Sequence, residues 1–287
     1  MNDGMFADGR VTILGVMNVT PDSFSDGGRF VREGSEAIDV DAVVEAGRLL
    51  IEDGADWLDV GGESTRPGAE DVAAEVELAR VVPAIESLVS RLGVRVSVDT
   101  RKAEVARAAI RAGVTAVNDV SGGAYDPDLV RVVADAPGVH LILGHMRGTP
   151  MTMQQAPRYD DVLREVATEL EFSLDAARRA GVSEERLVID PGIGFGKPLE
   201  ANLELIAHAG WFRERLGRPV LLGPSRKSFL GRITGDPVAA REVATHAACA
   251  VAAFAGADGV RVHDPAPVVR AIAVGRALRD ARRKELS

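Results

Sequence analysis

Short apolar runs rich in β-branched residues recur along the whole chain, and each is bounded by Gly, Pro, Asp or Ser. Runs of this kind are typical of strands buried on both faces of a parallel sheet. The runs cover residues 11–16, 57–60, 94–98, 116–120, 140–143, 187–189, 219–222 and 259–262. Helix-like stretches lie between them, for example residues 40–53, 73–92, 102–112, 159–180 and 237–255. Strand and helix patterns therefore alternate from one end of the chain to the other.

Eight strands that alternate with helices in 287 residues predict a single (β/α)8 TIM barrel, an α/β fold with a parallel eight-stranded core. The structural alternative is a doubly wound open sheet, which usually has a glycine-rich loop after its first strand. Here the first run leads into Asn18 and Pro21 without a glycine fingerprint. No Pro- or Ser-rich linker divides the chain. We expect a flexible, dispensable N-terminal leader over residues 1–10 and one barrel domain over residues 11–287.

Charge and cysteine content narrow the class of partner. The net charge of −9 argues against nucleic acid or an anionic membrane bound through a global basic field, although a few local Arg and Lys residues can still form a positive pocket. No apolar run approaches the roughly 20 residues that span a bilayer. The single cysteine, Cys249, allows no intrachain disulfide and fits a reducing compartment. We therefore expect a cytoplasmic protein that binds small molecules, with no nucleic-acid or membrane partner.

Polar, chemically capable residues follow every predicted strand. In a barrel the carboxyl ends of all strands meet on one face, where catalytic residues are found. One Asp or Asn at such a place could equally begin a turn or cap a helix, but a polar residue after all eight strands favours a site. These residues are Asn18, Asp59 and Glu63, Asp99, Asn118 and Asp119, His145, Asp190, Ser225 with Arg226 and Lys227, and Arg261 with His263.

Two basic groups stand near the end of the chain. Arg261 and His263 are two residues apart on the last strand and therefore share a face. A buried Arg needs a partner, which could be an anionic ligand or one of the strand-end aspartates. Ser225, Arg226 and Lys227 follow the seventh strand, where barrels often bind phosphate, and the alternative is a solvated basic turn. The sequence alone leaves both pairs of alternatives open.

Several common catalytic motifs are absent. Residues 192–197 superficially resemble a P-loop, but Pro191 and Pro198 stand where a glycine and a hydroxyl residue are required. There is no HExxH or CxxC motif, and the five histidines lack zinc spacing. A GxSxG elbow is also missing, which argues against a Ser-His-Asp hydrolase. Segments 20–39 and 63–72, rich in Gly, Ser, Asp and Pro, are instead predicted to be lids over the catalytic face.

The motifs at the strand ends resemble, in family order, the signatures of the dihydropteroate synthases. The first two are long: NVTPDSFSDGG begins at Asn18 and GGESTRPG begins at Gly61. The others are SVDT, NDVSGG, HMRG, DPGIGFGK, SRKS and RVHD, which begin at Ser97, Asn118, His145, Asp190, Ser225 and Arg261. The resemblance covers nearly the whole chain.

The resemblance implies a reaction in folate biosynthesis: 6-hydroxymethyl-7,8-dihydropterin diphosphate and 4-aminobenzoate become 7,8-dihydropteroate and diphosphate, with Mg²⁺ required. It implies a pterin site of Asp99, Asn118, Asp190, Lys227, Met146 and Phe195. It implies a diphosphate site of Asn18, Arg261, His263 and Ser225, with Asn18 also the Mg²⁺ ligand. It implies an aminobenzoate site of Phe24, Thr65, Arg66, Pro67, Phe195 and Ser228. The catalytic residues would be Lys227, Arg261, His263 and Asp99.

The resemblance also bears on mechanism and assembly. An aromatic amine is neutral at pH 7 and needs no general base, so the demanding step is cleavage of the C–O bond to the diphosphate. Mg²⁺ with Arg261 and His263 would neutralise the leaving group, and the lids would exclude water. Members of the family are typically homodimers, and they are targets of sulfonamides. The Ala-rich segment 238–257 could pack against a partner subunit. The alternatives are a pterin-binding methyltransferase barrel and a catalytically silent synthase paralogue.

Overall fold

The structure is a computed structural model that describes residues 5–6, 9–20, 30, 38–66, 68–155 and 157–284. Eight parallel strands pair in the order β6-β5-β4-β3-β2-β1-β8-β7. A bridge between Ile189 and Val220 joins β6 to β7 and closes the sheet into a barrel. The strands are β1 Thr12–Asn18, β2 Trp57–Gly61, β3 Val96–Asp99, β4 Ala116–Asp119, β5 His140–Gly144, β6 Leu187–Asp190, β7 Leu221–Leu222 and β8 Gly259–Val262. The predicted TIM barrel is confirmed.

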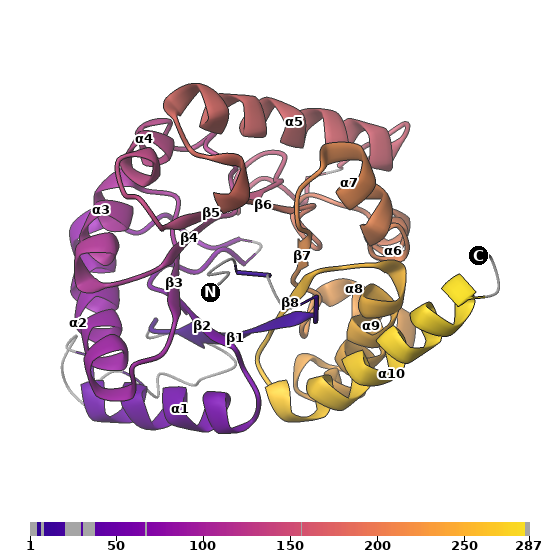
Figure 1. The fold of residues 1–287 in the computed structure, drawn as a ribbon, viewed down its shortest axis with the longest axis horizontal. Helices are drawn as coiled ribbons and strands as arrows, with labels where there is room; N and C mark the ends of the chain where they lie inside the picture. The colour runs from indigo at the N-terminus through magenta and orange to yellow at the C-terminus, as the bar shows by residue number, and fades with distance from the viewer. Residues whose placement is uncertain are drawn as a thin grey trace.

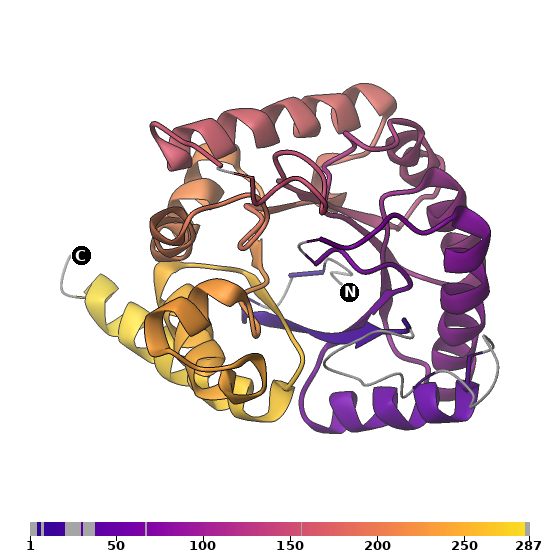
Figure 2. The ribbon, with the colours of Figure 1, turned by 180° about the vertical axis from the view of Figure 1, so that it is seen from behind.

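Helices form a ring around the strands, as the views from the two sides of the barrel show (Figures 1 and 2). They are α1 Val40–Glu52, α2 Ala74–Leu92, α3 Ala103–Ala112, α4 Asp128–Ala134, α5 Val162–Ala180, α6 Leu199–Ala207, α7 Ala209–Leu216, α8 Ser228–Thr234, α9 Glu242–Ala255 and α10 Pro265–Lys284. Two 3-10 helices, η1 Glu184–Arg186 and η2 Val238–Ala240, complete the described elements. None of the helices in the described ranges is both long and apolar enough to cross a membrane.

One predicted helix is divided in the structure. The stretch 237–255 forms η2 and α9, which meet at Arg241. The guanidinium of Arg241 donates hydrogen bonds to the carbonyl oxygens of Asp236 and Arg226, both 3.1 Å away. The break therefore turns an arginine toward the loop after β7, and a continuous helical pattern in the sequence did not reveal it.

Two layers of side chains fill the barrel, because alternate residues of each strand point inward. The apolar layer lies toward the amino ends of the strands and consists of Met5, Leu14, Trp57, Ala116, Ile142, Val188 and Leu221, all buried. The polar layer lies toward the carboxyl ends and consists of Asn18, Asp59, Asp99, Asn118, Asp190 and Arg261. A strand such as β2 contributes to both, with Trp57 below and Asp59 above. The barrel thus places its chemistry at one end only.

Met5 differs from the expected flexible leader. Its side chain is only 4% exposed and belongs to the apolar layer, with Phe6 packed against it. The hydroxyl of Thr12 donates a hydrogen bond to the carbonyl oxygen of Met5 over 3.0 Å. Residues 5–6 therefore cover the amino end of the barrel and are not a loose extension. The domain boundary at residue 11 itself stays a prediction.

Candidate functional site

The parallel register brings several predicted site residues to one rim of the barrel. Asn18 pairs with Gly61, Gly61 with Asp99, and Asp99 with Asn118, so these positions lie side by side on β1 to β4. On the opposite wall, Gly144 pairs with Asp190. Residues separated by more than 170 positions in the sequence thus share one end of the barrel.

Arg261 crosses the centre of this rim and pairs with two carboxylates. Its Nε donates to Asp59 and its Nη2 donates to Asp99 over 2.7 Å. Asp59 is fully buried and also accepts from the hydroxyl of Ser97, 2.5 Å away. The ion pair, one of the two alternatives for Arg261, is therefore present in the structure. Asp59 was noted as a strand-end residue, but its role as the partner of Arg261 was missed.

Two buried oxygen atoms at the rim lack a hydrogen-bond partner. Oδ1 of Asp99 and Oδ1 of Asn118 have none among the described residues, although both side chains are nearly inaccessible to solvent. A buried acceptor without a donor costs on the order of 1–3 kcal/mol. Burial raises the pKa of Asp99 to about 7, against the attraction of Arg261 and with the repulsion of Asp59. This pair is suited to accept hydrogen bonds from N–H groups of a ligand.

The opposite wall is formed by the loop after β6 together with Lys227. Oδ1 of Asp190 accepts from the backbone N–H of Gly192 over 2.7 Å, and burial raises the pKa of Asp190. The ammonium of Lys227 donates to the carbonyl oxygen of Ile193 and lies 4.4 Å from the centre of the Phe195 ring. Burial lowers the pKa of Lys227 to about 8, and the carboxylate of Asp190 opposes that change. The wall therefore offers both a hydrogen-bond donor and an aromatic face.

Basic side chains gather around His263 at the ends of β7 and β8. Nδ1 of His263 is 2.9 Å from Oγ of Ser225, which also accepts from the backbone N–H of His263 over 3.3 Å. Burial, together with the positive charges of Arg226, Arg261, Arg66 and Lys227, lowers the pKa of His263 to about 3. The ring is therefore neutral and shares one hydrogen bond between its Nδ1 and the hydroxyl of Ser225. These four cations make the surroundings of His263 positive, although the net charge of the whole protein is −9.

The turn that carries Arg226 is strained. Arg226 has a φ of +56°, which is uncommon for a residue with a side chain. Its backbone N–H donates to Oγ1 of Thr245 over 3.0 Å, and its carbonyl oxygen accepts from Arg241. Strained backbone that the surroundings hold in place is typical of functional sites. Thr245 and Arg241 therefore hold the turn in this conformation, and phosphate binding by the turn stays a prediction.

A network of buried charges anchors the second predicted lid. Arg101, only 1% exposed, pairs with Glu63 at 2.9 Å and with Asp71 at 3.0 Å, so it ties both ends of the loop together. Lys102 pairs with Glu63 at 3.0 Å and with Glu77 at 2.6 Å. Sequence reasoning missed this network, although two cations directly after a strand and an acid at the start of the loop were visible signals. The loop's placement is therefore defined by β3 and α2.

The remaining predicted residues divide into those the structure locates and those it does not describe. Met146, Thr65 and Arg66 are half-buried, and Ser228 is exposed at the start of α8. Phe24, Pro67 and most of the first predicted lid, residues 20–39, lie outside the described residues. Each described candidate belongs to a strand end or the loop that follows it.

The side-chain oxygen of Asn18, Oδ1, is a possible ligand for Mg²⁺. A Cβ atom built at Gly61 would lie 3.8 Å from Oδ1 of Asn18 and 3.9 Å from Oδ2 of Asp99, so both oxygens border the same small space. No group of three or more His, Cys, Asp or Glu residues within the described ranges could hold a metal ion. Mg²⁺ usually keeps several waters and binds one or two protein oxygens plus phosphate. An asparagine at this place fits such a site.

These features define a class: a TIM-barrel enzyme that binds a flat heterocycle with N–H donors and an anionic group at the carboxyl ends of its strands. A model of the family "Pterin binding enzyme" matches residues 14–263. A dihydropteroate synthase from Synechocystis is 42% identical over 94% of this chain and 90% of its own length. The chain belongs to this pterin-binding family and, within it, to the dihydropteroate synthases.

Solved structures show the same likeness. A Yersinia pestis dihydropteroate synthase in complex with a sulfonamide drug superimposes with a TM-score of 0.88 at 37% identity, and 95% of each chain is covered. A Xanthomonas albilineans dihydropteroate synthase with 4-aminobenzoic acid has a TM-score of 0.83 at 46% identity, with 94% of this chain and 93% of that chain covered. The fold, the family and the enzyme class predicted from the strand-end motifs are therefore confirmed.

Proposed function

We propose that this enzyme is a transferase that joins 6-hydroxymethyl-7,8-dihydropterin diphosphate to 4-aminobenzoate, giving 7,8-dihydropteroate and diphosphate. The observation that supports this most directly is a pair of buried acceptors, Oδ1 of Asp99 and Oδ1 of Asn118, which have no partner among the described residues and lie at the same end of the barrel as the basic side chains around His263. A pterin edge presents an amino group and a ring N–H, which are the donors that such acceptors need.

The pterin would lie between the two walls of the rim. Asp99, Asn118 and Asp190 accept hydrogen bonds from its amino and ring N–H groups. Lys227 donates to its carbonyl oxygen, at the cost of its present bond to Ile193. The side chains of Phe195 and Met146 flank the ring. The three acceptors are buried, the other three side chains are half-buried, and each polar group is suited to the pterin atom opposite it.

The diphosphate would lie among the basic side chains around His263. Arg261 and His263 donate to its oxygens, and Ser225 orients the His263 ring. As the bond between the exocyclic carbon and the bridging oxygen breaks, its electron pair goes to the diphosphate, and these donors stabilise the added charge. Mg²⁺, held by Asn18, diphosphate oxygens and water, supplies further neutralisation when bound. The protein's part is to bind, orient and neutralise the leaving group.

The aminobenzoate would approach from the loop side of the rim. Thr65 and Ser228 offer polar contacts, Arg66 a positive charge for the carboxylate, and Phe195 an apolar face, with Phe24 and Pro67 completing the proposed site. The amine attacks the exocyclic carbon as a neutral nucleophile and then loses a proton to water. A sulfonamide resembles 4-aminobenzoate in shape, and the Yersinia pestis relative forms a complex with a sulfonamide drug, so we expect sulfonamides to bind here.

Diphosphate release by the purified protein tests the proposal. With the pterin diphosphate and Mg²⁺, we expect release that depends on 4-aminobenzoate and accompanies formation of dihydropteroate. Omission of Mg²⁺ should abolish it. Pterin binding in a calorimeter without any product would instead identify a catalytically silent paralogue, and transfer of a methyl group would identify the methyltransferase type of barrel.

We also propose a homodimer. Five large apolar residues on α9 and α10 are exposed, namely Val243 at 79%, Val274 at 59%, Leu278 at 57%, Val251 at 48% and Val269 at 41%. The two helices lie side by side at the outside of the ring (Figure 1), so these side chains can contribute to one surface. Sedimentation at micromolar concentration should give twice the mass of the chain. The cytoplasmic location expected from the single cysteine stays a prediction.

A further inference from the structure

The loop after β6 is held between two lysines, the buried Lys197 and the half-buried Lys227. Lys227 contacts it from the side of the barrel interior, through the carbonyl oxygen of Ile193 and the ring of Phe195. Lys197 contacts it from behind: its Nζ donates to the carbonyl oxygen of Phe195 over 3.0 Å. The proposed reaction uses Lys227 but not Lys197. Lys197 is thus a buried lysine behind the loop that carries Phe195, and the proposed reaction gives it no role.

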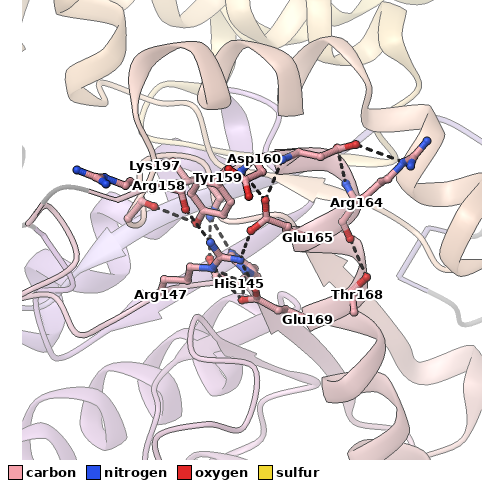
Figure 3. Close-up of polar contacts among 12 residues, drawn as sticks. His145, Arg147, Arg158, Tyr159, Asp160, Arg164, Glu165, Thr168, Glu169 and Lys197 are labelled. Carbon is pink, nitrogen blue, oxygen red and sulfur yellow. Dashed lines mark hydrogen bonds and ion pairs between the residues drawn. The ribbon is translucent and has the colours of Figure 1, made fainter.

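Lys197 heads a chain of hydrogen bonds that leaves the site (Figure 3). Its Nζ lies 2.9 Å from Nδ1 of His145 and donates to the carbonyl oxygen of His145 over 3.2 Å. Nε2 of His145 is 2.9 Å from Oε2 of Glu169, which lies on α5 outside the barrel. The His145 side chain is 4% exposed, and so is that of Lys197. The chain therefore connects an outer helix to the interior loop.

The hydrogen-bond partners define the protons of this chain. Nζ of Lys197 has three acceptors, so all three hydrogens of an ammonium are used. Nδ1 of His145 must then accept, which leaves the ring proton on Nε2, directed at the carboxylate of Glu169. Burial and the neighbouring Lys197 lower the pKa of His145 to about 4, in agreement with a neutral ring. One assignment of protons satisfies every member of the chain.

The charge of Lys197 is costly to keep. Burial, together with the positive charges of Lys227 and Arg147, lowers the pKa of Lys197 to about 7, and the carboxylates of Asp190 and Glu169 oppose that change. Glu169 remains ionised because hydrogen bonds from His145 and Arg147 lower its pKa to about 2. Glu169 is thus one of two anions that keep the ammonium of Lys197 charged near neutral pH.

The loop after β6 is packed closely against the segment after β5 that carries His145. Gly192 has a φ of +74°, and a Cβ atom there would collide with the carbonyl oxygen of His145. The backbone N–H of His145 donates to the carbonyl oxygen of Asp190 over 2.9 Å. The hydroxyl of Tyr159, whose ring lies beside His145, donates to the carbonyl oxygen of Gly196 over 3.0 Å. A change at His145 or Lys197 is therefore transmitted directly to Asp190 and Phe195.

We propose that Glu169 is a positioning residue for the pterin site: through His145 it holds Lys197, and Lys197 fixes the loop that presents Asp190 and Phe195. This inference rests on the proposed function, since it assumes that a pterin binds against this loop. Glu169 touches neither substrate. Its effect should therefore be on pterin affinity and not on the chemical step.

The matched control lies one helical turn away. Glu165 is on the same face of α5 and pairs with Arg147 at 2.7 Å, as Glu169 also does, but it makes no contact with His145. Glu169→Gln keeps a hydrogen-bond acceptor for Nε2–H and removes the charge. Glu165→Gln removes an equal charge from the same helix and the same arginine. Only Glu169→Gln should lower the pKa of Lys197.

Calorimetric titration with 6-hydroxymethylpterin, which lacks the diphosphate, tests this at two pH values. We expect that only the enzyme with a charged Lys197 binds the pterin, and that Lys197 loses its proton about one pH unit lower in Glu169→Gln. The affinity of Glu169→Gln for the pterin, relative to that of the unchanged enzyme, should then fall about tenfold at pH 8 and less than twofold at pH 6. Glu165→Gln should match the unchanged enzyme at both. In turnover, Glu169→Gln should raise the KM for the pterin diphosphate with kcat within twofold.

A second variant closes the argument. Lys197→Met should weaken pterin binding at both pH values, and Glu169→Gln added to it should cause no further loss, because the two act through one group. Normal affinity in Glu169→Gln at pH 8, an equal loss at both pH values, or an equal loss in Glu165→Gln would each overturn the proposal. Failure of the unchanged enzyme to bind the pterin would instead contradict the proposed function.

Discussion

The two ends of the barrel are built from the same strands but follow opposite rules. At the amino end, the layer is apolar and buried, and Trp57, Leu14 and Ile142 belong to it. At the carboxyl end, two residues further along β2, Asp59 is fully buried with its charge. There, acceptors on Asp99 and Asn118 have no partner among the described residues. The apolar layer adds to the free energy of unfolding, whereas the buried charges and acceptors of the polar layer lower it and are available to a ligand.

This contrast has a physical basis in the parallel barrel. Strand ends emerge from the sheet at the carboxyl side, so the loops that follow them can supply charged groups such as Arg66 and Arg226 and a neutral imidazole at His145. The amino side receives short connections, and there the buried Met5 covers the opening. A substitution should therefore affect activity at one end and stability at the other, even when both positions lie on one strand.

Arg261→Ala should have the largest effect, and it tests the polar layer. The change removes a donor to the leaving group and leaves Asp59 and Asp99 buried without their counter-charge. Loss of one preorganised donor costs about 10²–10³ in kcat, so kcat/KM for the pterin diphosphate should fall about a thousandfold. Diphosphate release measures it. Arg261→Lys keeps the charge and should retain more activity. A loss below tenfold in Arg261→Ala would remove the leaving-group role.

Trp57→Ala tests the apolar layer on the strand that carries Asp59. Trp57 is 2% exposed and packs edge-on against His140, with ring centres 6.3 Å apart. Loss of a buried large aromatic side chain costs about 3 kcal/mol of the free energy of unfolding at the low end of the usual range. Urea denaturation measures it. The kinetic constants of the folded variant should be unchanged, and a KM altered more than threefold would break the separation between the two layers.

Met5→Ala should have a smaller effect of the same kind. Met5 is buried among Leu14, Trp57 and Ile142, so its truncation should cost about 2 kcal/mol in unfolding free energy. Thermal unfolding measures it, and Phe6→Ala, which changes a less buried neighbour, is the control. An unchanged melting temperature in Met5→Ala would mean that the leader is dispensable, as the sequence alone suggested.

Features that repeat along the chain were predictable from sequence. The run 259–262 coincides with β8, and most other strands end within two residues of their predicted ends, because buried parallel strands leave a clear apolar signal. The strand-end positions of Asn18, Asp99 and Asp190 followed from the same pattern. By contrast, the Glu169–His145–Lys197 chain joins residues 24 and 52 positions apart through tertiary contacts. No local pattern marks Glu169 among the many charged residues of an exposed helix.

Asn18→Ala should have the smallest effect and sharpens the comparison, since Asn18 shares β1 and its inward face with Leu14. The proposed Mg²⁺ site takes one protein oxygen, so its loss should raise the Mg²⁺ concentration for half-maximal activity by about tenfold, the lower end of the range for groups that support a metal site. Asn18→Asp retains an oxygen ligand and should restore the normal requirement. Stability should barely change, since Asn18 lies at the half-buried end of its strand. An unchanged Mg²⁺ requirement in Asn18→Ala, with normal activity, would show that the metal is bound by the diphosphate alone.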